Sequence, residues 1–232
     1  MNSRRPLLHA GWLGIATIAF SFYLNSVFPT FAGEMQPGFT NPVLAFEFVE
    51  NVDEVKALFS FDTAEELQLF RSKMDHGNRL DFIFMVIYNG FLFFLGWLLF
   101  KHSGRKPFFY ILPLALVALA GDILETLQLL NISSRIDEDS LATPVLLLKW
   151  FTWLKWGALA LIMHVFGLWL VKGARWMKIL STIAFAVPIL GFIALFRPGL
   201  MNEFFALGIG LMFLGLTLTA FFYKDKEAVH PT

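Results

Sequence analysis

The chain alternates between long apolar stretches and short charged connections. Six stretches have the length that a helix needs to cross about 30 Å of hydrocarbon, which is roughly 20 residues. They lie near residues 7–28, 80–100, 108–131, 144–171, 177–196 and 200–223. This pattern predicts an all-α, polytopic membrane helix bundle with six transmembrane helices. Because no internal repeat or second domain interrupts it, we expect a single transmembrane domain over residues 1–232.

The connections predict how the bundle is oriented. Ten lysines and arginines fall on one side of the predicted membrane, and the acidic loop Arg135-Ile136-Asp137-Glu138-Asp139 falls on the other. Lysine and arginine in short loops favour the cytoplasmic side, so we expect both termini to be cytoplasmic. The ten cations are Arg4, Arg5, Lys101, Arg105, Lys106, Lys172, Arg175, Lys178, Lys224 and Lys226.

The first apolar stretch allows two interpretations. Its basic start and the Thr30-Phe31-Ala32 sequence that follows it are typical of a signal peptide with a cleavage site. Its apolar run is longer than the hydrophobic region of a typical signal peptide. We therefore expect a retained membrane helix.

The segment between the first two spans, residues 29–78, is predicted to form an outer helical cap. Asn51 with Glu54, and Asp62 with Glu65, have the spacing of a helix capping box. Two or three short helices are therefore expected here. The segment is either a folded connector over the helix ends or a lid over a cavity, and Glu47 inside an apolar run motivates the second possibility.

Charged residues inside the predicted spans are the main functional signal. They are Asp81, Asp122, Glu125, Lys149 and Lys155. Each adds at least ~2.5–3.5 kcal/mol to the free energy of insertion, and such residues usually face the bundle interior. At 1.5 Å per residue, Glu125 matches Lys149 in depth below the outer surface, and Asp122 matches Lys155. We expect these acids and lysines to contact each other, directly or through water, because pairing makes burial tolerable.

Two kinds of aromatic residue accompany the charges. Tyr88 shares a helix face with Asp81 and joins the predicted polar group. Trp150, Trp153 and Trp156 lie among the two lysines. The tryptophans either form a wall for a cation or an apolar ligand, or serve as interface anchors and packing residues.

Four short motifs carry a resemblance. They are Phe46-Glu47, Leu80-Asp81-Phe82-x-Phe84-x-x-x-Tyr88, Gly121-Asp122-x-x-Glu125 and Lys155-Trp156. Together they resemble an uncharacterised family of bacterial polytopic integral membrane proteins, over roughly residues 40–170. The resemblance brings no assigned activity. What it implies is limited to singling out Glu47, Asp81, Tyr88, Asp122, Glu125, Lys155 and Trp156. We expect the chain to lie in a bacterial inner membrane.

Composition excludes several classes of function. The chain has no cysteine, which excludes disulfides, iron–sulfur clusters and cysteine-bound zinc. No two of its five histidines have metal-ligand spacing, so we expect no metal and no cofactor. Its 18 basic and 18 acidic residues balance, and no nucleic-acid reading motif is present, so no nucleic-acid partner is expected.

Three functions remain open. The buried group of Glu47, Asp81, Tyr88, Asp122, Glu125, Lys149, Lys155 and Trp156 favours binding or transport of a small molecule or lipid. Alternatively, the charges only staple the helices in a structural or partner-dependent protein. A membrane enzyme with carboxylate acid/base chemistry is the third possibility. The lipid bilayer is the one partner that the sequence defines, and protein partners stay undetermined.

Overall fold

The computed structural model describes residues 4–138 and 140–223. Within them, six helices are long and apolar enough to span a membrane. This is a multi-pass membrane protein, as the apolar pattern predicts. The six are α1 (Arg4–Val27), α4 (Ala64–Ser103), α6 (Ile111–Ser134), α7 (Ala142–Leu170), α8 (Arg175–Phe196) and α9 (Leu200–Phe222). Asp139 of the acidic loop, and Lys224 and Lys226, lie outside the described residues.

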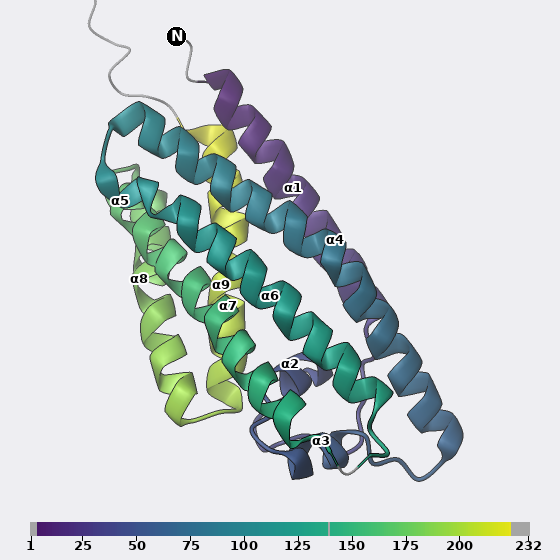
Figure 1. The fold of residues 1–232 in the computed structure, drawn as a ribbon. Helices are drawn as coiled ribbons and strands as arrows, with labels where there is room; N and C mark the ends of the chain where they lie inside the picture. Colours follow the sequence, from purple (N-terminus) through teal and green to yellow (C-terminus); the bar gives the residue numbers. More distant parts are fainter. Residues whose placement is uncertain (1–3, 139, 224–232) are drawn as a thin grey trace, which may run out of the picture.

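The six long helices pack lengthwise against one another (Figure 1), and their contacts close a ring. Each contacts the next in the order α1, α4, α6, α7, α8 and α9, and α9 closes the ring against α1. A single turn of helix, α5 (Lys106–Phe109), precedes α6. The start of α1 and the end of α9 lie at the same end of the bundle, and Trp12 contacts Phe221 there with ring centroids 5.8 Å apart. Two short helices lie at the opposite end.

Helix α4 is much longer than its predicted span. Its 40 residues extend about 60 Å at 1.5 Å per residue, twice the hydrocarbon thickness. The predicted span 80–100 covers only its second half. The first half carries charged residues, so the apolar pattern did not include it. The helix begins one residue later than its predicted capping box, with the Thr63 hydroxyl accepting a hydrogen bond from the Glu66 backbone N–H at 3.2 Å.

Residues 29–63, which we call the cover, fold over the end of the bundle away from the chain termini (Figure 1). The cover contains the two short helices, α2 (Pro42–Glu47) and α3 (Val52–Leu58), as expected for this segment. Asn41 caps α2, and Asn51 caps α3 as predicted, accepting from the Glu54 backbone N–H at 2.9 Å. The first cap positions α2 so that its last residue, Glu47, faces the bundle.

The cover has an apolar core of its own. Phe46 and Phe59 are buried with ring centroids 5.2 Å apart, and Phe70 at the start of α4 packs against Phe59 at 5.0 Å. The same cluster includes Leu129 of α6 and Leu148 of α7. Burial of large apolar side chains therefore fixes the cover on the helix ends.

The cover is also tied to the start of α9. One oxygen of Glu203 accepts hydrogen bonds from the backbone N–H groups of Thr40, at 2.7 Å, and Asn41, at 2.9 Å. These bonds hold the chain just before α2, so both ends of that helix are placed relative to the bundle.

Candidate functional site

Lys155 lies at the centre of a buried group of charges. Its side chain, near the middle of α7, is only 8 % exposed. The ammonium contacts Glu47 Oε2 at 3.2 Å, Asp122 Oδ1 at 3.3 Å and, more closely, Glu125 Oε2. We call these four residues the acidic cluster. The predicted contact between Asp122 and Lys155 is confirmed.

Each carboxylate of the acidic cluster also accepts a hydrogen bond from a neutral donor. The Tyr88 hydroxyl on α4 donates to Asp122 Oδ2 at 2.5 Å. The Trp156 indole N–H donates to Glu47 Oε2 at 3.0 Å, and the Thr152 hydroxyl lies 2.8 Å from Glu125 Oε1. Buried carboxylates are tolerated only when such bonds fill their remaining acceptor positions. Four elements, α2, α4, α6 and α7, thus contribute to one polar network.

A glycine lets the two central helices approach closely. A methyl group at Gly121 would lie 2.8 Å from the backbone nitrogen of Lys155, a distance that real side chains do not tolerate. The residue next to it, Asp122, is followed by Glu125 at helical spacing, so both carboxylates face α7. The small residue therefore brings α6 near enough for the carboxylates to reach the ammonium.

Asp81 lies at the edge of this network. Its side chain is only partly buried, and its Oδ2 accepts a hydrogen bond from the Thr126 hydroxyl at 3.5 Å. Thr126 follows Asp122 by one helical turn on α6. The structure therefore joins Asp81 to the cluster through a neighbouring side chain.

The predicted pairing of Lys149 with Glu125 is wrong. Lys149 contacts Glu50 of the cover at 3.0 Å, and its side chain is 39 % exposed. Six residues separate it from Lys155, which turns the two side chains about 120° apart on an α-helix. Only one of them can face α6, and Glu125 therefore shares Lys155 with Asp122.

Two of the three tryptophans pack inside the protein, and the third is exposed. Trp150 is 68 % exposed and points away from the bundle. Trp153 and Trp156 pack against Phe48 of the cover, with centroid distances of 5.4 Å and 5.7 Å. The Lys155 ammonium lies 5.2 Å from the Trp156 ring centre, within the range of a cation–π contact.

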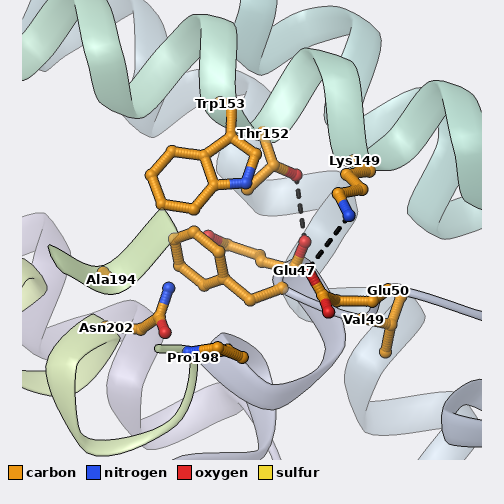
Figure 2. A pocket seen from close by; sticks show the side chains of 10 residues that line it. Glu47, Val49, Glu50, Lys149, Thr152, Trp153, Ala194, Pro198 and Asn202 are labelled. Atoms are coloured by element: carbon orange, nitrogen blue, oxygen red, sulfur yellow. Dashed lines mark hydrogen bonds and ion pairs between the residues drawn. The ribbon is translucent and has the colours of Figure 1, made fainter. Parts of the chain in front are cut away.

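A small cavity lies between the cover, α7 and the turn that precedes α9 (Figure 2). Its volume is about 10 Å³, close to the smallest space that holds a water molecule. Glu47 and Thr152 line it on the cluster side, and the exposed Lys149–Glu50 pair lines it as well. The cavity therefore adjoins both the acidic cluster and the protein surface.

Sequence reasoning did not include three residues that the structure places here. Thr152 could have been found, because it precedes Lys155 by three residues and shares its helix face. Glu50 and Asn202 could not, since only the folding of the cover and the position of the α8–α9 turn bring them to the cavity.

The described part of the chain holds no group of three or more histidine or acidic side chains arranged to bind a metal ion. Comparisons with protein-family models, curated proteins and solved structures give no match to this chain. The chemistry of the acidic cluster is therefore the main indication of what the protein does.

Proposed function

We propose that this membrane protein binds a small, positively charged molecule at the acidic cluster and moves it across the membrane. The supporting observation is the imbalance of the cluster. One buried ammonium faces three carboxylates, of which Asp122 and Glu125 are buried and Glu47 is partly buried. A cluster that only held helices together would need no more acids than bases.

The imbalance requires a further positive species. Uncompensated charge inside a protein is strongly unfavourable, and the group neutralises itself by binding protons or a cation. Tyr88, Thr152 and Trp156 supply hydrogen bonds, but no positive charge. The acidic cluster can therefore take up cations beyond its own lysine.

Lys155 itself indicates which ligands fit. Its ammonium is surrounded by carboxylate oxygens and lies over the Trp156 ring. Carboxylates and aromatic faces are the groups that proteins use to recognise ammonium ligands. A small alkylammonium or guanidinium compound would find the same partners when Lys155 moves aside.

The cover controls access in this proposal. Glu47 is the residue through which α2 reaches the acidic cluster, by its bonds to Lys155 and Trp156. When those bonds break, the cover can lift and open the cluster toward its side of the membrane. The structure then corresponds to the closed form of the binding site.

A structural role is the second candidate, favoured by the direct contacts within the cluster. The two proposals differ for Asp122→Asn, which removes one charge and keeps an acceptor for Tyr88. If the charges only hold the helices together, this variant misfolds, and an added Lys155→Met partly restores folding. If the acids are in surplus, the single variant folds and loses ligand binding.

The binding proposal is tested by the melting temperature of the purified protein in nanodiscs, at one ionic strength. The probes are the chlorides of sodium, potassium, methylammonium, guanidinium and choline. A ligand present at about 100 times its Kd stabilises a protein by about 2.7 kcal/mol. One class of cation is expected to raise the melting temperature of the wild type and of the control Glu50→Gln, but not that of Glu125→Gln. If none of the five does so, the proposal is overturned.

We also propose that the protein lies in a bacterial inner membrane with both termini in the cytoplasm, as the connecting lysines and arginines favour. Because the chain has no cysteine, each introduced cysteine is the only labelling site. A membrane-impermeant maleimide is expected to label Asp62→Cys in intact spheroplasts, and Ser103→Cys only after permeabilisation. Both positions are exposed, and they lie near opposite ends of α4. The reverse labelling pattern would show the opposite orientation.

A further inference from the structure

The small cavity next to the acidic cluster contains a polar group that the proposed binding site does not use. Asn202, in the first turn of α9, is fully buried. Its Oδ1 accepts a hydrogen bond from the Gly199 backbone N–H at 2.9 Å. Its amide nitrogen has no partner among the described residues. Figure 2 shows this nitrogen turned toward the side chains across the cavity.

A buried donor without a partner usually indicates a bound water molecule. The cavity has about the volume of one water, and its lining supplies the Asn202 amide, Glu47 and Thr152 as polar neighbours. A water needs two to four such partners to be held in place. The cavity therefore has room for one ordered water that accepts from the Asn202 amide, and Glu47 lines the same space.

We propose that this water and Glu47 form a proton route between the cover side of the membrane and the acidic cluster. The Lys149–Glu50 pair lines the same cavity and is exposed to solvent, so protons can arrive there. Glu47 is the next group inward, and Lys155 bridges it to Glu125. The route requires only that the cluster holds protons, so it does not depend on the proposed cationic ligand.

The route consists of three proton transfers that conserve charge. In the first, an O–H bond of a hydronium ion in the cavity breaks as an O–H bond forms on the Glu47 carboxylate, leaving neutral water. In the second, an N–H bond of the Lys155 ammonium breaks and its proton joins Glu125. The proton on Glu47 then passes to the Lys155 nitrogen and restores the ammonium. The net result is one proton moved from the aqueous side to Glu125.

Other charged groups face this route and share its protons. Asp122 on α6 also contacts Lys155, and Tyr88 on α4 donates to Asp122. Asp81 on α4 lies at the edge through Thr126. On α9, the cavity contact is the neutral Asn202. Protons entering through the cavity can therefore spread over several carboxylates, and the cavity controls how fast they enter.

Infrared spectroscopy of the full-length protein in nanodiscs tests this route. Protonated buried carboxyl groups give a C=O stretching band that shifts to lower frequency when D₂O replaces H₂O. The wild type is expected to show this band, and Glu125→Gln is expected to weaken it. The time course of the shift after rapid mixing with D₂O measures proton exchange between the cluster and solvent.

Two variants close the route without touching the acidic cluster. Ala194→Val adds two methyl groups at the cavity wall and removes no polar partner, and Asn202→Leu removes the donor. Both are expected to slow the band shift by about tenfold, since the loss of one hydrogen bond from the relay raises the barrier by about 1.4 kcal/mol. The matched control is Asn78→Leu, at another buried asparagine, which lies on α4 and does not line the cavity. Its amide nitrogen also lacks a partner in the described part of the chain. This variant should exchange at the wild-type rate.

Two results would overturn the inference. A folded Ala194→Val protein that exchanges at the wild-type rate would show that protons enter elsewhere. Absence of the carboxyl band in the wild type would show that the cluster holds no protons. Neither result decides whether an added cation raises the melting temperature, so failure of the route and failure of the proposed function are distinguishable.

Discussion

Replacing Lys155 by methionine is expected to cause the largest loss of stability of any single substitution in the acidic cluster. The change leaves two buried carboxylates and the partly buried Glu47 without their ammonium. Removing one partner of a buried ion pair typically destabilises a protein by about 3–5 kcal/mol. Denaturant unfolding in detergent, followed by circular dichroism, measures the effect.

The matched control is Lys149→Met, six residues earlier on α7. Lys149 forms its ion pair with Glu50 at the surface, and exposed pairs of this kind contribute about 0–1 kcal/mol. Adding Glu125→Gln to Lys155→Met is expected to recover part of the loss, because one uncompensated charge disappears. Equal destabilisation by Lys155→Met and Lys149→Met would mean that the buried charges do not determine stability.

Replacing Phe46 by alanine is expected to detach the cover while the helix ring stays intact. The Phe46 side chain is fully buried between the cover and the bundle, in contact with Phe59. Truncation of a buried phenylalanine to alanine destabilises by about 3–5 kcal/mol. Limited proteolysis should therefore cut faster within residues 29–63, and the transmembrane helices should stay protected.

The control for this prediction is Phe22→Ala. Phe22 lies on α1 and is 71 % exposed in the structure, so its removal leaves no internal cavity. Its cleavage pattern should match that of the wild type. If Phe46→Ala resists the protease as well as Phe22→Ala does, the aromatic cluster does not anchor the cover.

The apolar pattern predicted the six spans because hydrocarbon imposes one length requirement on every crossing helix. It failed at the start of α4, because the charged residues Glu65, Glu66 and Arg71 interrupt the apolar pattern there. The helix nevertheless begins before them and is about 60 Å long in all. Hydropathy indicates which part of a helix is apolar enough to lie in lipid. It does not indicate where the helix ends, because a polar segment can continue the same helical backbone. Helix length and membrane span are therefore separate properties of this segment.

The acidic cluster could be predicted in part. Depth counting paired Asp122 with Lys155 correctly, since both lie on neighbouring antiparallel helices. It assigned Lys149 wrongly, because depth says nothing about the direction in which a side chain leaves the helix. Glu47 was singled out by its apolar surroundings and its motif, but its contact with Lys155 depends on how the cover folds. Tertiary contacts of that kind have no periodic signal in a single sequence.

The place of the acidic cluster in the chain has a consequence for how the protein is made. Asp122 and Glu125 on α6, and Lys155 on α7, belong to consecutive helices joined by residues 135–141. A helical hairpin can leave the ribosome and enter the lipid as one unit, with Lys155 already paired to carboxylates of the neighbouring helix. Biosynthetic insertion of these two helices therefore need not wait for α8 and α9 to be translated.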